Sequence, residues 1–270
     1  MLEGTALTSG DDTWTPDEAV RYEEFAEKSF SWRCIEEPSL RSLIEPRIGD
    51  TGGALDLGCG NGRIIGLLRK LGIAEEAIFG IDSDQTLIRI VTSRYPNANF
   101  ACQNITQPPY LVAAPRIDLA TAHFVLQYLT VDELMKCLTE LHRLLAPRGY
   151  LAIGLPHPAR VAQQAGASYF ARVHHRIPAP WGGFTTSSGL TVSDYLNCIM
   201  QARFTLRRVE EPEISTRCLG ESGANAYAAG PTRLMILAQA VSLPGRGRAK
   251  KPRLLPNRAR RSHADCAICC

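Results

Sequence analysis

Residues 54–63 read Ala-Leu-Asp-Leu-Gly-Cys-Gly-Asn-Gly-Arg and form the most informative local pattern in the chain. Ala54–Leu57 is a short, largely apolar strand, and the glycines that follow allow the backbone to turn sharply and to approach a ligand closely. Arg63–Leu71 then has apolar residues at helical spacing, and Gly72 ends the helix. The pattern predicts a strand, a glycine turn and a helix whose first N–H groups face a bound ligand.

Strands and helices alternate on both sides of this turn. The expected strands are Ala54–Leu57, Ala77–Ile81, Asn99–Cys102, Ile117–Ala122, Tyr150–Leu155, Phe204–Glu210 and Arg233–Val241. The expected helices are Asp17–Phe30, Arg33–Ile44, Arg63–Leu71, Ser83–Tyr95 with Ser83 as its N-cap, Val131–Leu145 and Val192–Gln201. This order predicts an α/β fold, in which a doubly wound, mostly parallel seven-stranded sheet carries helices on both faces. The last two strands are expected to pair as a hairpin.

The rest of the chain divides into one domain and two loose ends. Residues 16–243 are predicted to form the domain, residues 1–15 a flexible arm, and residues 244–270 a basic, disordered tail. Within the domain, residues 157–190 are rich in His, aromatic residues, Gly and Ser. Together with the N-terminal helices, this insertion is expected to form a cap over the carboxyl edge of the sheet, where such folds bind ligands.

The formal net charge of +3 hides an uneven distribution. Residues 245–270 hold eight Lys or Arg and one acid, whereas the other 244 residues carry a net charge of −4. A domain that binds nucleic acid normally has a basic balance of its own, so nucleic acid is not expected as a partner. No apolar run approaches the roughly 18 residues that cross a bilayer, and no secretory signal is visible. We therefore predict a cytoplasmic protein that does not enter the membrane.

The cysteines show no paired spacing within the domain. We interpret six of them as reduced thiols, most of them buried like small apolar residues: Cys34, Cys59, Cys102, Cys137, Cys198 and Cys218. The terminal Cys-Ala-Ile-Cys-Cys has no second ligand pair nearby, and no metal site is expected.

The glycine turn does not suit a dinucleotide. The GxGxxG pattern would need a third glycine where Arg63 or Ile65 stands. Asp56, at the tip of the strand, would repel a pyrophosphate but attract the ammonium of S-adenosylmethionine (SAM). Asp82 ends the second strand 20 residues after Gly62, where a carboxylate can accept hydrogen bonds from both ribose hydroxyls. This second feature also occurs in NAD enzymes, so Asp82 does not discriminate between them.

These residues closely resemble the class I SAM-dependent methyltransferases. The pattern Leu-Asp-Leu-Gly-Cys-Gly-Asn-Gly at 55–62 and Gly-Ile-Asp at 80–82 is similar to the first two motifs of the family. Residues 117–129 are similar to its fourth-strand motif, and residues 141–151 to the turn before its fifth strand. The resemblance covers about residues 50–155 motif by motif and residues 17–241 by layout.

The resemblance implies SAM as cofactor and S-adenosylhomocysteine (SAH) as product. The implied cofactor-binding residues are Tyr22, Asp56, Gly58, Cys59, Gly60, Asn61, Asp82, Ser83, Gln103, Asn104, Ile105 and His123. Many family members place an acid after the third strand to accept from the adenine amino group. Here Asn104 aligns best, and its amide carbonyl can accept the same bond; a loop-turn role for Gln103 and Asn104 is the alternative.

Two histidines are candidate catalytic residues. His157 follows the fifth strand and His123 follows the fourth, and the pKa of a histidine suits removal of a proton from an acceptor. The alternatives are a histidine that anchors the cap or lies on the surface, for His157, and a packed structural histidine, for His123. Candidate substrate-binding residues surround the same edge, with plain packing as their alternative: Trp32, Gln127, Tyr128, Tyr169, His174, His175 and Trp181.

The function predicted from these features is in-line transfer of a methyl group to an O or N atom of a small organic substrate, which an aromatic cap would suit. An RNA or protein methyltransferase recruited by the basic tail and a non-catalytic SAM-binding subunit are the alternatives. A nicotinamide oxidoreductase is disfavoured by the missing third glycine. A homodimer is compatible with the sequence.

Overall fold

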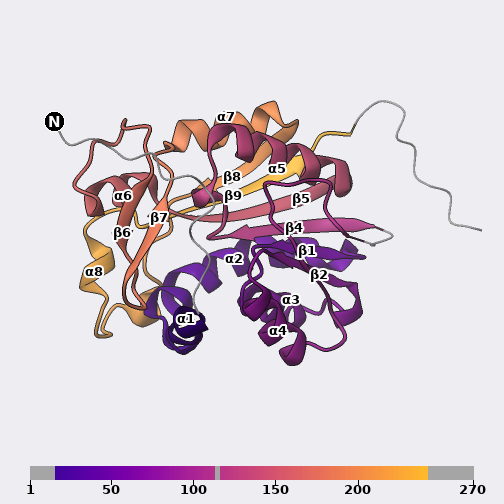
Figure 1. Ribbon diagram of the computed structural model, residues 1–270, viewed down its shortest axis with the longest axis horizontal. Helices are drawn as coiled ribbons and strands as arrows, with labels where there is room; N and C mark the ends of the chain where they lie inside the picture. The colour runs from indigo at the N-terminus through magenta and orange to yellow at the C-terminus, as the bar shows by residue number, and fades with distance from the viewer. Residues whose placement is uncertain (1–15, 113–115, 243–270) are drawn as a thin grey trace, which may run out of the picture.

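A seven-stranded sheet forms the centre of the protein. The computed structural model describes residues 16–112 and 116–242, so the predicted arm and tail lie outside it. The strand order is β3-β2-β1-β4-β5-β9-β8 (Figure 1). The strands are β1 (Ala54–Leu57), β2 (Ile78–Asp82), β3 (Asn99–Cys102), β4 (Ile117–His123), β5 (Leu145–Pro156), β8 (Phe204–Glu210) and β9 (Arg233–Ala240). The first five are parallel, and β9 is antiparallel to both β5 and β8. The predicted fold class and the terminal hairpin are confirmed.

Helices cover both faces of the sheet, as predicted (Figure 1). One face carries α5 (Val131–Leu144) and α7 (Val192–Gln201). The other carries α2 (Glu37–Ile44), α3 (Arg63–Lys70) and α4 (Gln85–Arg94). Each face buries its own apolar cluster, because the strands present side chains alternately to the two sides. None of the described helices is long and apolar enough to cross a membrane.

The helix starts follow local capping chemistry. Thr130 and Thr191 begin α5 and α7 with complete capping boxes, in which Glu133 and Asp194 bond back to the cap. The prediction of Ser83 as the N-cap of the fourth helix is wrong by one residue. Asp84 is the cap, and its carboxylate accepts from the N–H groups of Thr86 and Leu87. A carboxylate caps at least as well as a hydroxyl, and position 84 leaves Ser83 in the loop.

The N-terminal helices are interrupted by a π-helical turn. After α1 (Pro16–Lys28), the predicted helix from Arg33 to Ile44 divides into the π-turn η1 (Trp32–Glu36) and α2. Turns of this kind are often found at functional sites because they redirect side chains.

The predicted insertion has secondary structure of its own. It contains α6 (Pro158–Gln164) and a hairpin of β6 (His175–Pro178) and β7 (Phe184–Ser187). The segment between β8 and β9 adds η5 (Thr216–Cys218) and α8 (Asn225–Ala228). In Figure 1 the hairpin reaches towards α1, and Trp181 of the hairpin loop packs against Tyr22 and Phe25 of α1. The insertion and the N-terminal helix therefore meet.

Cys34 and Cys218 form a disulfide, which corrects the interpretation of six reduced thiols. The two residues are 184 positions apart, so no spacing in the sequence relates them. Packing of η1 against η5 brings their Cα atoms to 5.9 Å, within the range that a disulfide spans. An ion pair between Arg33 and Glu221 lies beside the bond. Cys59, Cys102, Cys137 and Cys198 are free thiols, and all except Cys102 are buried.

Gly154 in β5 gives a direct test of packing at the centre of the sheet. A Cβ at this position would lie 2.1 Å from Nδ1 of His123 and 3.2 Å from the sulfur of Met235. We expect Gly154→Ala to destabilise the protein by about 1–3 kcal/mol, because an added methyl must displace a fixed ring. Urea denaturation measures the change, and Gly49→Ala, where nothing lies within 4 Å, is the matched control. Equal stability of the two variants would contradict the packing described.

Candidate functional site

The glycine turn after β1 leaves one open position. Gly58, Gly60 and Gly62 all have positive φ, of 63°, 51° and 87°. A Cβ at Gly58 would lie 2.5 Å from a methyl of Val125, so Gly58 is closed in by the protein. A Cβ at Gly60 would meet nothing within 4 Å. The half-buried backbone at Gly60 is therefore open on one side, three residues before α3 begins, as expected for close approach of a ligand.

Asp56 lies beneath this turn with one carboxylate oxygen unused. Its Oδ1 accepts a 2.6 Å hydrogen bond from the hydroxyl of Thr121 on β4. Its Oδ2 is buried and has no hydrogen-bond partner among the described residues. Burial raises the pKa of Asp56 to about 7, the bond from Thr121 opposes the shift, and the charge of Asp82 adds to it. A buried carboxylate with a free oxygen is suited to bind a cationic donor such as an ammonium.

Asp82 connects the ends of β1 and β2. Its Oδ2 accepts from the N–H of Gly60 at 2.8 Å, and its Oδ1 accepts from the N–H of Asp84 at 2.9 Å. Burial raises the pKa of Asp82, against the effect of these two bonds. Each oxygen retains a second lone pair, so the carboxylate can still accept from a pair of hydroxyls. The two acids predicted from the sequence are thus brought to one edge of the sheet, on either side of the open glycine.

The loop after β3 is shaped by the side chains proposed for the adenine. Gln103 donates to the carbonyls of Gln107 and Pro109 and accepts from the N–H of Leu111. The Oδ1 of Asn104 accepts from the N–H of Thr106, as in an Asx turn. Both amides therefore have the loop-turn role that the sequence left open.

A buried carboxylate joins four elements beside the glycine turn. Glu36 of η1 is 1% exposed, and its Oε1 accepts a 2.8 Å hydrogen bond from Nε of Arg233 at the start of β9. Its Oε2 is 3.3 Å from Nε2 of His123 at the end of β4 and 3.7 Å from Nη1 of Arg63 at the start of α3. Burial alone would raise the pKa of Glu36, but Arg233, His123 and Arg63 together hold it well below its usual range. Glu36 is therefore a buried anion held by neighbouring cations.

Aromatic residues from the cap surround this cluster. The guanidinium of Arg63 lies over the rings of Trp32 and Tyr22, at 4.8 and 5.8 Å from their centroids. Burial raises the pKa of Tyr22, and the charges that act on its hydroxyl include those of Arg63 and Asp82. The hydroxyl of Tyr128 lies 3.2 Å from that of Thr185 on β7. Tyr22 contacts Trp181, and both Tyr22 and Trp32 contact Arg63, while their roles towards cofactor and substrate stay predictions.

The two candidate catalytic histidines have their ring nitrogens in protein contacts. Nε2 of His123 faces Glu36, and its Nδ1 is buried against Gly154 without a partner. Burial lowers the pKa of His123, so the ring is neutral near pH 7. His157 is the N-cap of α6, where its Nδ1 accepts from Ala159 N–H and its Nε2 is 2.8 Å from Glu211. These contacts support the structural alternatives, in which His157 anchors the cap and His123 packs beneath it.

The remaining substrate candidates divide between the site and the cap. The hydroxyl of Tyr169 accepts from the N–H of Val192, which ties it to the start of α7. His175 is buried within the hairpin, opposite Ser187, with His174 beside it, and burial lowers the pKa of His175. Gln127 is buried between the end of β4 and α5, and its Oε1 has no partner among the described residues. Tyr169 and His175 therefore stabilise the cap in this geometry.

Three charged residues of the cluster were not predicted. Glu36, Arg63 and Arg233 come from segments that are far apart in the sequence, so their meeting could not be read from it. A weak signal existed, because Glu36 falls among the apolar residues of a predicted helix and Arg63 directly follows the glycine turn.

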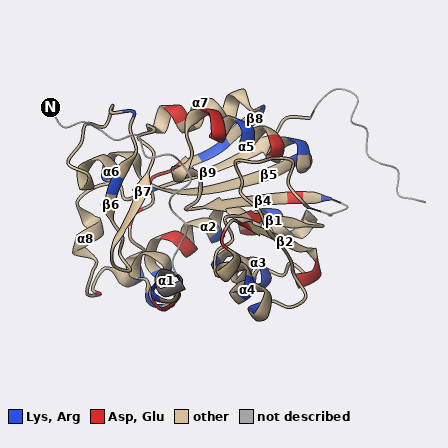
Figure 2. Ribbon diagram, viewed as in Figure 1, with Lys and Arg blue, Asp and Glu red and all other residues tan. Residues whose placement is uncertain are grey.

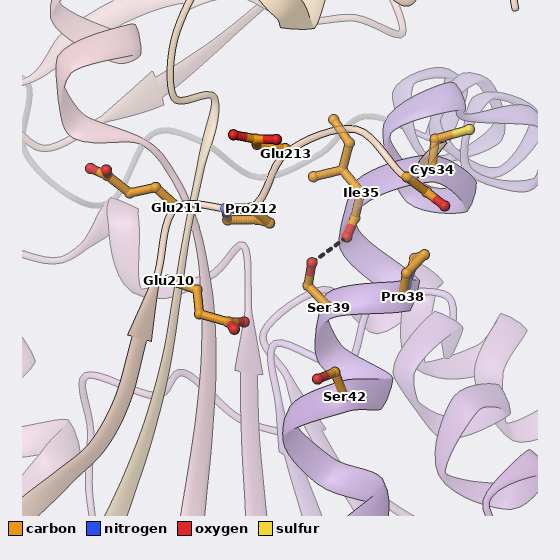
Figure 3. A pocket seen from close by; sticks show the side chains of 10 residues that line it. Cys34, Ile35, Pro38, Ser39, Ser42, Glu210, Glu211, Pro212 and Glu213 are labelled. Atoms are coloured by element: carbon orange, nitrogen blue, oxygen red, sulfur yellow. Dashed lines mark hydrogen bonds between the residues drawn. The ribbon is translucent and has the colours of Figure 1, made fainter. Parts of the chain in front are cut away.

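A separate groove of about 440 Å³ lies between α2 and the end of β8 (Figure 3). Pro38, Ser39 and Ser42 line it from α2, and Glu210, Glu211 and Glu213 from the opposite side. It includes none of the residues predicted to contact the cofactor.

Comparison with known proteins agrees with this geometry. Residues 55–153 match the family described as a methyltransferase domain, which includes β1, the glycine turn, Asp82, β4 and most of β5. Over these residues the chain is similar to the methyltransferase domain, and its motifs resemble those of the class I SAM-dependent methyltransferases. The cofactor of this family is SAM, as the glycine turn and its two acids predicted.

Relatives and solved structures show how far the likeness extends. Phosphoethanolamine N-methyltransferase 1 of Zea mays is 29% identical over 119 residues, 43% of this chain and 23% of that protein. A putative SAM-dependent methyltransferase from Listeria monocytogenes has a similar fold, with a TM-score of 0.64, 16% identity and coverage of 80% of this chain and 99% of that chain. The N-methyltransferase NodS of Bradyrhizobium japonicum, solved with SAH, has a TM-score of 0.55, 16% identity and coverage of 81% and 91%. The chain spans about a quarter of the length of the maize enzyme.

The pKa of Asp56 predicts a pH-dependent stability. An acid whose pKa is raised from 3.8 to about 7 by folding stabilises the folded state fully below pH 3.8, and this contribution is lost as the pH rises through 7. Through this group, the free energy of unfolding of the wild type should fall by at most about 4 kcal/mol between pH 4 and pH 8. We expect Asp56→Asn not to show this fall. Urea denaturation of the ligand-free protein and the variant across this range measures the difference. A constant difference between the two at all pH values would contradict the raised pKa.

Removal of the Glu36 charge is expected to be costly. Glu36→Gln leaves the cations Arg63 and Arg233 without their counter-charge, and breaking a buried ion pair costs about 3–5 kcal/mol. Glu37→Gln is the matched control, because Glu37 pairs with Arg41 on the surface of α2, where such pairs contribute about 0–1 kcal/mol. Thermal denaturation followed by circular dichroism compares the two variants. Similar losses of stability in both would show that the contacts of Glu36 with Arg63 and Arg233 do not stabilise the fold more than a surface ion pair does.

Proposed function

We propose that this protein transfers a methyl group from SAM to a nitrogen atom of a small organic acceptor. The observation that carries the proposal is the free, buried Oδ2 of Asp56 next to the open backbone of Gly60, within the glycine turn of a class I methyltransferase. A carboxylate oxygen buried without a donor is costly, and an ammonium would satisfy it. The residues therefore fit the amino-acid end of SAM.

We place the cofactor across the ends of β1 and β2. Bound SAM supplies a methyl group on a sulfonium, from which a nucleophile can take it directly. In this placement Asp56 binds the ammonium, Gly58–Asn61 approach through the backbone, and Asp82 accepts from the ribose hydroxyls. Ser83 and the loop from Gln103 to Ile105 border the adenine.

The acceptor would lie between the glycine turn and the cap, beside Tyr22, Trp32, Tyr128 and Trp181. Aromatic faces suit an amine, which is cationic when protonated. Two similar proteins are N-methyltransferases by name, the maize enzyme and NodS, which supports nitrogen over oxygen. Because neither His123 nor His157 has a ring nitrogen free towards this space, we propose that the protein acts by in-line placement, on an acceptor that arrives deprotonated.

A small molecule fits the charge distribution better than a nucleic acid. Acidic and basic residues are interspersed over the described helices and strands in Figure 2. A surface that follows a phosphate backbone would need clustered Lys and Arg. Location in the cytoplasm stays a prediction.

Calorimetric titration with SAH tests the cofactor site. We expect Asp82→Asn to weaken SAH binding about 10- to 100-fold, because two hydroxyl contacts and the bond to Gly60 N–H depend on the carboxylate. Asp132→Asn, at an exposed residue of α5, is the control and should bind SAH like the wild type. Methyl transfer from labelled SAM to a panel of small amines, with matched alcohols and a short RNA, tests the acceptor. Transfer to the RNA alone would overturn the proposed acceptor, and absence of SAH binding would overturn the proposed cofactor.

A further inference from the structure

Arg63 is a largely buried cation, and one nitrogen of its guanidinium has no hydrogen-bond partner among the described residues. Its side chain is 13% exposed, and its Nη2 is buried without a hydrogen-bond partner among the described residues. Its nearest acid is Glu36, at 3.7 Å from Nη1, which is longer than a hydrogen bond. A buried N–H group without an acceptor is costly and is normally satisfied by the protein or by a ligand.

The charges around Arg63 do not balance. Glu36 is shared between two guanidinium groups, and its direct 2.8 Å hydrogen bond goes to Arg233 rather than to Arg63. His123 is neutral near pH 7 because burial lowers its pKa, so it adds no charge. The cluster of Glu36, Arg63 and Arg233 therefore holds one positive charge in excess. Buried ions are stable when they are paired, so this cluster is suited to receive one further anion.

The orientation of Arg63 favours a planar or tetrahedral oxyanion. Trp32 and Tyr22 both lie against the guanidinium, with their ring centroids at 4.8 and 5.8 Å from its central carbon. Aromatic contacts of this kind hold a guanidinium in place while its N–H groups stay available. A carboxylate or phosphate can accept two parallel bonds from such a group.

Arg63 also lies next to the proposed cofactor. It directly follows Gly62 at the start of α3. Three residues before Arg63, the N–H of Gly60 donates to Oδ2 of Asp82, the acid proposed to accept from the ribose hydroxyls. An anion on Arg63 would thus lie where the cofactor and the acceptor meet.

We propose that Arg63 binds a carboxylate or phosphate group, held in position by Glu36, Trp32 and Tyr22. This inference rests on the proposed function. The anionic group belongs either to the cofactor, as its carboxylate, or to the acceptor. In either case Arg63 sets specificity, because a ligand without the anion leaves the guanidinium unpaired.

Paired probes with and without the anion test this role. Calorimetry on the full chain compares SAH with its decarboxylated analogue, and then phosphoethanolamine with ethanolamine on the SAH-saturated protein. For Arg63→Gln we expect at least a tenfold loss of affinity for SAH or for phosphoethanolamine. The affinity for the matching probe that lacks the anionic group should change less than twofold. Arg63→Lys should lose less, because it keeps the charge but not the paired donors. Lys70→Gln, at the exposed end of the same helix, should bind every probe like the wild type.

The outcomes separate the two sources and the two proposals. A loss for SAH but not for its decarboxylated analogue assigns the cofactor carboxylate, and a loss for phosphoethanolamine alone assigns an anionic acceptor. Unchanged affinity for both anionic probes, or equal losses within each pair, would overturn the role of Arg63. Thermal denaturation confirms that each variant is folded, and Arg63→Lys carries the test if Arg63→Gln is not. If the wild-type chain does not bind SAH, the proposed function itself fails, whatever the variants do.

Discussion

The buried carboxylate of Glu36 connects four parts of this protein that are far apart in the sequence. It belongs to the π-turn before α2, and it contacts residues at the ends of β4 and β9 and at the start of α3. An anion with almost no exposure is stable only if cations surround it, so Arg63 and Arg233 must approach it. Their aromatic neighbours, including Trp32 and Phe124, then pack around the guanidinium groups. This arrangement helps to hold the N-terminal helices over the sheet, together with the disulfide and the ion pair between Glu23 and Arg94.

Two different kinds of interaction build the candidate site. The half formed by the glycine turn depends on residues that are close in the sequence. β1, which contains Asp56, is followed directly by the turn at Gly58–Gly62 and then by α3. The half formed by the cap is long-range, because Tyr22, Glu36, Trp181 and Arg233 come from four separate segments. The disulfide between Cys34 and Cys218 strengthens the second half, since it joins η1 to the segment between β8 and β9. Asp82 also stabilises the glycine turn from the neighbouring strand, because its Oδ2 accepts from the N–H of Gly60, 22 residues earlier in the sequence.

Predictions from the sequence succeeded where the structure depends on near neighbours. The strand at 54–57 was predicted with its observed bounds, because an apolar run between turn residues marks a buried strand. The bounds of the less buried strands at 99–102 and 204–210 were also predicted. Ser83 was wrong as a cap because Ser and Asp both suit that position and only the backbone angles choose Asp84. His157 was read as a catalytic candidate from its place after β5, whereas its Nε2 faces Glu211, 54 residues further on. A residue so far along the chain gives no signal next to the histidine.

The sequence by itself determined the fold class, the edge of the sheet at which the glycine turn lies and the two acids at that edge. It could do so because hydrophobic periodicity and the conformational freedom of glycine act within a few residues. Only the tertiary structure decided which charges meet in the interior, which cysteines bond and which histidines face inward. These outcomes depend on pairs such as Glu36 with Arg233 and Cys34 with Cys218, which are 197 and 184 residues apart. Electrostatic pairing and disulfide formation depend on distance in space, and only the folded arrangement of the sheet and its helices sets those distances.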